Sequence, residues 1–184
     1  MTQRAILVLA VGLGLGYGWL RGATVGWSPR MATFAPSSDG ATARPVVADG
    51  GAHACFAGGC YWSTQARFED LPGVTSVVAG HVDGREGVWI SFDPARTSYE
   101  ALLEHFWRGV DPFAIGGQFC DLGEPYRAAV HAVDAESRRK AEASKRALEQ
   151  RLGRPVSIPI VEGGSFVPAP EPVQHFARRH PIQY

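Results

Sequence analysis

A cysteine stands between two glycines and two aromatic residues in the stretch FAGGCYWS, residues 56–63. A buried strand is expected before the glycine pair and a helix after it, which would place Cys60 at a helix N-terminus. There, free backbone N–H groups and the helix dipole favour the thiolate, the reactive form of cysteine. Tyr61 and Trp62 supply flat apolar walls beside the sulfur. The pattern predicts a reactive thiol next to a small hydrophobic pocket.

Other interpretations of the cysteines stay open at this point. A buried structural thiol is common, and three cysteines cannot all pair within one chain. A metal site is the weaker alternative, because Cys55 and Cys60 lack the usual short ligand spacing and no histidine lies at a convincing interval. We therefore predict no metal.

Strands and helices that would position Cys60 are predicted from periodicity and from turn residues. Strands are expected at residues 53–58, 74–82, 87–92, 126–133 and 156–161, and helices at residues 60–71, 98–109 and 134–152. Asp83 and Gly84 give a hairpin turn between the second and third strands. Pro159 places the last strand at a sheet edge, because proline cannot donate to a ladder. Residues from Glu162 onwards are expected to be irregular.

The ends of the helices carry cap signals. Thr97 and Glu100 have capping-box spacing, while Asp134 and Gly153 bound a long charged helix. The order β-α-β-β-α, then β-α-β, indicates an α+β fold in which helices pack on a short antiparallel sheet. We expect an architecture close to a ferredoxin-like sandwich.

The N-terminal third differs in composition from the rest. Residues 1–21 hold an apolar run between Arg4 and Arg21, which predicts a signal peptide or a membrane anchor. Either would export the chain, to the periplasm or to the outer side of the inner membrane. Residues 22–52 are rich in Ala, Ser, Thr, Gly and Pro, as in a disordered linker, and residues 53–184 form the expected domain. The net charge is zero, which argues against nucleic-acid binding.

Several segments of this domain resemble the A-type peptide methionine sulfoxide reductases, namely FAGGCYW, SFDP, HFWRGVDP, QFCDLGEPYRAAV and the ending HPIQY. The similarity covers nearly all of residues 53–184. It implies an α/β sandwich and reduction of the S-epimer of methionine sulfoxide, free or in proteins, as repair after oxidation. It implies no metal or organic cofactor, and electrons from a thioredoxin-like or other thiol donor protein.

The resemblance also implies roles for matched residues. Cys60 falls at the nucleophile, which attacks the sulfoxide sulfur and becomes a sulfenic acid. Tyr61 and Trp62 fall at the aromatic pair that holds the methyl group of the substrate. Tyr126 falls at a tyrosine that hydrogen-bonds the sulfoxide oxygen, and Asp121 at an acidic residue lining the same site.

Glu86 falls at the family's catalytic acid, which protonates the sulfoxide oxygen. Burial beside aromatic rings can keep such a carboxyl protonated near neutral pH, because desolvation raises its pKa. The local sequence alone favours an exposed hairpin glutamate just past Gly84. The family's loop before this acid is shortened here, so a closed hairpin could leave Glu86 facing solvent.

Recycling of an oxidised Cys60 has three candidate routes. Cys120, next to Asp121, could attack the sulfenic acid, and Cys55 is the second candidate, although either could be a structural thiol instead. Direct reduction by an external thiol is the third route. An exported enzyme would need a dedicated donor, because disulfides persist outside the cytoplasm.

Two further functions stay open. The shortened loop could have produced a non-catalytic or weakly active relative that binds sulfoxides or peptides. Alternatively, Cys60 could act with Cys55 or Cys120 in a general thiol-disulfide enzyme. The leading prediction is an exported or membrane-anchored methionine sulfoxide reductase.

Overall fold

The computed structural model describes residues 44–45 and 51–182. The predicted signal or anchor segment, residues 1–21, and most of the predicted linker, residues 22–52, lie outside this range. Within the described part of the chain, none of the helices has the length and apolar character needed to cross a bilayer.

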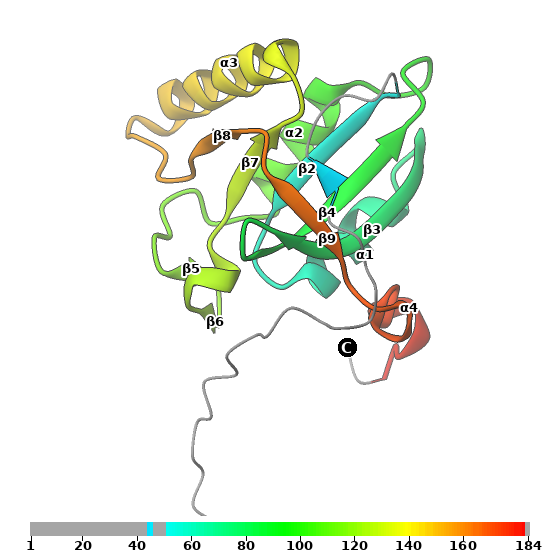
Figure 1. The fold of residues 1–184 in the computed structure, drawn as a ribbon. Helices are drawn as coiled ribbons and strands as arrows, with labels where there is room; N and C mark the ends of the chain where they lie inside the picture. The colour runs from blue at the N-terminus through cyan, green and yellow to red at the C-terminus, as the bar shows by residue number, and fades with distance from the viewer. Residues whose placement is uncertain (1–43, 46–50, 183–184) are drawn as a thin grey trace, which may run out of the picture. The chain divides into compact units, whose positions relative to one another are not determined.

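A large sheet forms the centre of the described domain (Figure 1). Its strands are β1 (Arg44–Pro45), β2 (His53–Ala57), β3 (Val74–Val82), β4 (Arg85–Phe92), β7 (Ala129–Ala132), β8 (Ile160–Glu162) and β9 (Ser165–Pro168). They lie in the order β1-β9-β3-β4-β2-β7-β8. A small separate hairpin joins β5 (Gly117–Gln118) to β6 (Asp121–Leu122).

The helices are α1 (Tyr61–Glu69), α2 (Tyr99–Arg108), α3 (Ala135–Leu152) and α4 (Phe176–Arg179), with 3₁₀ turns η1 (Glu124–Tyr126) and η2 (Glu171–Val173). The predicted α+β class is confirmed. The sheet is mixed, however, because β8 runs parallel to β7. Helix α3 connects these two strands, and a crossover helix is what a parallel pair requires. Strand β8 ends the strand order, so the predicted edge position is confirmed, but the strand covers Ile160–Glu162 rather than residues 156–161 and Pro159 lies just before it.

Some predicted boundaries are wrong. The strand expected at residues 126–133 begins only at Ala129, because η1 occupies the preceding residues. The N-cap of α2 is Ser98, whose hydroxyl accepts the Ala101 N–H at 3.2 Å, so the capping box expected at Thr97 does not form. The caps of α3 at Asp134 and Gly153 are confirmed.

The segment after Glu162 is also ordered, contrary to the prediction. Strand β9 pairs with β3 and lies between β1 and β3 in the sheet, and helix α4 packs on α1. The local sequence could not show this, because the strand that pairs with β9 lies far away along the chain.

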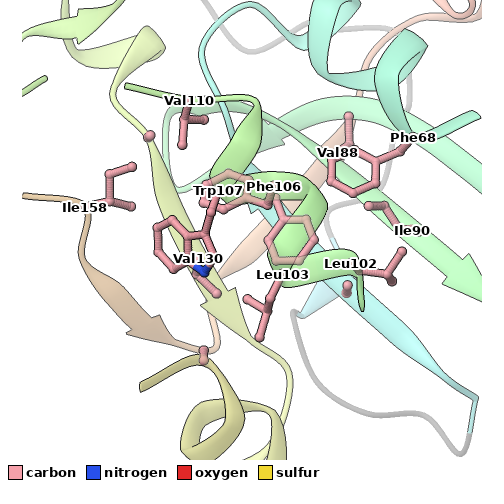
Figure 2. Packing of buried hydrophobic residues seen from close by; sticks show 14 of the residues in the cluster. Phe68, Val88, Ile90, Leu102, Leu103, Phe106, Trp107, Val110, Val130 and Ile158 are labelled. Atoms are coloured by element: carbon pink, nitrogen blue, oxygen red, sulfur yellow. The ribbon is translucent and has the colours of Figure 1, made fainter. Parts of the chain in front are cut away.

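The main core lies between the sheet and helices α1, α2 and α3 (Figure 2). Phe56 of β2 stacks on Phe68 of α1 and on Phe106 of α2, with ring centroids 5.5 Å and 4.9 Å apart. Burying a phenylalanine side chain stabilises a fold by about 1.5–3 kcal/mol. This packing fixes β2 and α1 relative to each other, and therefore the short turn between them.

A tight turn joins β3 to β4. Asp83 and Gly84 have φ values of 48° and 80°, as in the primed turns that match strand twist. The hairpin prediction is confirmed, but β4 begins at Arg85, two residues earlier than expected. Side chains alternate across a strand, so Glu86 shares the helix-covered face with Val88 and Ile90.

Candidate active site

Cys60 is the N-cap of α1 and follows β2 after two glycines that the packing requires. Gly59 has a φ of 90°, and a Cβ there would lie 2.7 Å from the Cβ of Gln118. A Cβ on Gly58 would lie 2.9 Å from the hydroxyl of Thr64. The backbone carbonyl of Cys60 accepts the Thr64 N–H at 3.0 Å, which begins the helix. The turn therefore has no room for side chains, and the thiol is the first group after it.

The thiol of Cys60 is half-buried, and burial raises its pKa above the ordinary value. The N–H groups of Ser63 and Trp62 lower this pKa, as the helix N-terminus predicts, but desolvation has the larger effect. The nearby charge of Glu86 raises the pKa further. The predicted net preference for the thiolate is therefore wrong for the unliganded site, in which Cys60 is a protonated thiol at neutral pH.

Glu86 points into the protein and is only 4% exposed. Its Oε2 accepts the backbone N–H of Tyr61 at 2.8 Å. Burial raises the pKa of Glu86 to about 7, against the opposing effect of this hydrogen bond. The exposed hairpin glutamate favoured by the local sequence is thus wrong, and the shortened hairpin still directs the carboxyl inward.

Tyr126 and Asp121 lie near the same groups. Burial raises the pKa of Tyr126, and the charges of Glu86, Asp121 and Cys60 add to the rise. The phenol is therefore a neutral hydrogen-bond donor throughout the physiological range. Burial also raises the pKa of Tyr61 to about 12. The structure brings together a thiol, a protonatable carboxyl and a phenol.

Aromatic rings line one side of the thiol. The ring of Tyr61 stacks on that of Trp62, with centroids 5.7 Å apart. Trp62 stacks more closely on Phe176 of α4, at 3.9 Å and an interplanar angle of 14°. The indole N–H of Trp62 donates to the carbonyl of Val173 at 3.1 Å. The C-terminal segment thus fixes the orientation of the indole beside Cys60.

Two buried glutamines attach this C-terminal segment to the sheet. The side chain of Gln174 accepts the Ala79 N–H at 2.9 Å and donates to the Ala79 carbonyl at 2.8 Å. Gln65 of α1 donates to Gln174 at 2.9 Å and accepts the His175 N–H at 2.7 Å. No local sequence pattern marks Gln65, Gln174 or Phe176 as functional, because their partners lie far away along the chain.

The family model for peptide methionine sulfoxide reductase matches residues 52–184. This chain belongs to the peptide methionine sulfoxide reductase family. Peptide methionine sulfoxide reductase MsrA 2 of Rhizobium meliloti (strain 1021) is 37% identical to it in an alignment 147 residues long, and the alignment covers 72% of this chain and 74% of that protein. Peptide methionine sulfoxide reductase MsrA of Bacillus licheniformis is 37% identical in an alignment 150 residues long, and the alignment covers 71% of this chain and 83% of that protein.

Solved structures of methionine sulfoxide reductases share the fold of this chain. Mxr1 from Saccharomyces cerevisiae in reduced form aligns with a TM-score of 0.67 at 19% identity, covering 78% of this chain and 92% of that chain. Methionine sulfoxide reductase A of Corynebacterium diphtheriae aligns with a TM-score of 0.63 at 19% identity. The alignment covers 76% of this chain and 79% of that chain. At such identities the likeness supports the fold alone.

The other two cysteines of this family member occupy different environments. Cys55 is fully buried in β2, and it packs with Trp89 and Phe166 on the sheet face away from Phe56. Burial raises the pKa of its thiol strongly. Cys120 is exposed in the turn between β5 and β6. Of the two candidate resolving thiols, only Cys120 is accessible to another molecule.

Proposed function

We propose that this chain reduces the S-epimer of methionine sulfoxide, free or in proteins, to methionine. The observation that carries the proposal is the buried carboxyl of Glu86, which accepts the first N–H of α1, the helix that Cys60 caps. Family membership supports the same activity.

In this mechanism the sulfur of Cys60 attacks the sulfoxide sulfur, while Glu86 protonates the sulfoxide oxygen and Tyr126 donates a hydrogen bond to it. The S–O bond of the substrate breaks and the oxygen passes to Cys60 as a sulfenic acid. The substrate sulfur is reduced to a thioether, and the sulfur of Cys60 supplies the two electrons. Rings of Tyr61 and Trp62 hold the methyl group of the substrate.

Regeneration requires a thiol donor. Two donor thiols convert the Cys60 sulfenic acid back to a thiol, releasing water and forming one disulfide. The accessible Cys120 supports a route in which its thiol first forms a disulfide with Cys60. Direct attack by the external thiol is the second route, and a thioredoxin-like protein suits either.

A binding module without catalysis is less well supported than the enzyme. The case for it was that the shortened hairpin could expose Glu86, and this side chain is buried. A general thiol-disulfide enzyme that uses Cys55 is also less well supported, because that thiol lies in the core.

We also propose the remaining assignments that the sequence suggested. Residues 1–21 would export the protein as a signal peptide or membrane anchor, with residues 22–52 as a linker and residues 53–184 as the catalytic domain. The order β3-β4-β2-β7, with α1 and α2 as connections, supports assigning the core to the ferredoxin-like sandwiches. Cell fractionation of the full chain would test export.

The function is tested with separated S- and R-epimers of N-acetylmethionine sulfoxide and dithiothreitol as reductant. We expect reduction of the S-epimer alone and complete loss of activity in Cys60→Ser. Cys55→Ala, a change at a buried thiol on the other sheet face, serves as the matched control and should stay active. Reduction of the S-epimer by Cys60→Ser at the wild-type rate would end the proposal.

A further inference from the structure

Three large apolar side chains are exposed close together in the chain, at the small hairpin that follows α2. Ile115 is 74% exposed, Phe119 is 69% exposed and Leu122 is 76% exposed. In the described part of the chain, they are three of the five large hydrophobic residues that face solvent. Grouped exposed apolar side chains mark interaction surfaces. We call residues 115–122 the apolar hairpin.

The apolar hairpin has a tightly defined backbone. Gln118 pairs with Asp121, so Phe119 and Cys120 form the turn between β5 and β6. Phe119 has a φ of 54°, a left-handed conformation that bulky residues rarely adopt. At Gly117 a Cβ would lie 2.1 Å from the carbonyl oxygen of Asp121, so the two strands approach too closely for a side chain. The turn therefore presents Phe119 to solvent from a constrained backbone.

Gln118 attaches the apolar hairpin to the turn before the thiol. Its side chain is buried, accepts the Asp111 N–H at 2.7 Å and donates to the Asp111 carbonyl at 3.1 Å. Its Cβ lies directly against Gly59, which precedes Cys60. The hairpin extends from the large sheet in Figure 1, and this attachment fixes its position relative to the thiol.

The apolar hairpin also contributes to the site itself. The charge of Asp121, in β6, raises the pKa of Cys60, of Glu86 and of Tyr126. Its neighbour Leu122 is exposed beside it. With Gln118 against Gly59 and Asp121 near the thiol, the hairpin lies at the rim of the substrate site, and the exposed Phe119 and Leu122 are within two residues of Asp121.

A polypeptide that presents a sulfoxide to Cys60 must bring its backbone to this rim. The side chain of methionine sulfoxide is short, and an extended chain advances only about 3.3 Å per residue. The residues on either side of the sulfoxide therefore come within reach of Phe119 and Leu122. Asp121 is the one charged residue in the segment 115–122, so the rim offers apolar contact rather than charge pairing.

We propose that the apolar hairpin binds the residues that flank methionine sulfoxide in polypeptide substrates, and that it makes the enzyme prefer apolar flanking residues. This inference rests on the proposed function. The substrate class is an extended or unfolded segment in which the oxidised methionine lies between apolar side chains, as methionines from protein interiors do. Free methionine sulfoxide has no flanking residues and gains nothing from this surface.

The test compares three S-epimer substrates with dithiothreitol as reductant: free methionine sulfoxide, a pentapeptide with leucine and phenylalanine beside the sulfoxide, and a pentapeptide with serine on both sides. The double variant Phe119→Asn and Leu122→Thr removes the apolar contacts, and asparagine tolerates the left-handed turn position. For the apolar pentapeptide we expect kcat/KM to fall about tenfold, the effect of losing roughly one buried apolar side chain. Turnover of the free amino acid should stay within about twofold of wild type.

Leu152→Gln is the matched control, because Leu152 is an exposed apolar residue at the end of α3 and lies outside the hairpin. Equal losses on all three substrates would overturn the proposal, because they would show a general effect on the site. If the double variant kept the wild-type kcat/KM for the apolar pentapeptide, the proposal would be overturned as well. This would hold even if turnover of the variant with a protein thiol donor fell, because the hairpin would then bind the donor and not the substrate. Failure of wild type to reduce free methionine S-sulfoxide would instead refute the proposed function.

Discussion

The backbone N–H of Tyr61 donates a 2.8 Å hydrogen bond to Oε2 of Glu86. Tyr61 directly follows Cys60 in the chain. The N–H that binds the carboxyl of Glu86 therefore belongs to the peptide bond between Cys60 and Tyr61. This hydrogen bond stabilises the carboxylate, whereas burial destabilises it, and the balance leaves the pKa of Glu86 at about 7. Such an acid is protonated in about half of the molecules at neutral pH, as proton transfer to a sulfoxide oxygen requires.

Replacing Glu86 with glutamine should lower kcat for the S-epimer by roughly a hundredfold to ten-thousandfold, the usual contribution of a positioned proton donor. The amide keeps the size of the side chain and can still accept the Tyr61 N–H, but it cannot give up a proton. Steady-state turnover of N-acetylmethionine S-sulfoxide measures the effect. Glu104→Gln, on the exposed side of α2, is the control. Equal kcat values for Glu86→Gln and wild type would move the acid role to another group.

The pH profile should show two limbs. The proposed reactive form carries a proton on Glu86 and none on Cys60, and its share is greatest between the two pKa values. The pKa of Glu86 is about 7, and burial raises that of Cys60 above 9.0. We expect kcat/KM to rise up to about pH 7, to stay level from there to the pKa of the thiol, and to fall above that pKa. Measurements from about pH 5 to about pH 10 check this, and a steady decline above pH 7 would contradict it.

Folding stability should also depend on Glu86. Its pKa is raised from 4.5 to about 7 by burial, so the folded state holds this proton more tightly than the unfolded chain does. The stabilisation is complete below the unfolded pKa and is lost as pH rises through the folded pKa. Ionisation of the folded protein therefore costs on the order of 3 kcal/mol.

Glu86→Gln removes this cost. The free energy of unfolding of the variant, relative to wild type, should increase between pH 4.5 and pH 8 by about 2–3 kcal/mol. Urea unfolding at both pH values measures the difference, with Glu104→Gln as a variant that should show no such trend. A difference that is the same at both pH values would refute the assigned pKa.

The position of the acid was partly readable in the sequence. Val88 and Ile90 alternate with Gly87 and Trp89 in the sequence, a period of two that indicates which residues of β4 face the core, and one more step of two reaches Glu86. The prediction stopped short because the strand was expected to begin at Gly87, after a longer turn. Because the Asp83–Gly84 turn closes directly onto Arg85, the strand includes Glu86. The alternation along the strand then directs the side chain of Glu86 toward the core.

Other parts of the site could not be predicted from local sequence. Gln174 bonds to Ala79 and Gln65 across sequence separations of 95 and 109 residues. No local pattern reports such contacts, so the segment looked irregular. The direction of the pKa shift of Cys60 could not be predicted from local sequence either. The helix N-terminus is visible in the sequence, but the burial that outweighs it depends on tertiary packing.

Phe176 should act as a positioning residue for the indole of Trp62, the ring that we propose holds the substrate, since the two rings stack at 3.9 Å. Phe176→Ala removes this contact while the Trp62 N–H keeps its bond to Val173. An aromatic pair contributes about 0.5–1.5 kcal/mol, so we expect KM for N-acetylmethionine S-sulfoxide to rise roughly twofold to tenfold with kcat nearly unchanged. Phe176→Tyr should restore KM, and Phe113→Ala, at a ring stacked under Arg154, is the matched control. A parallel fall of kcat in Phe176→Ala, without rescue by tyrosine, would indicate a purely structural role.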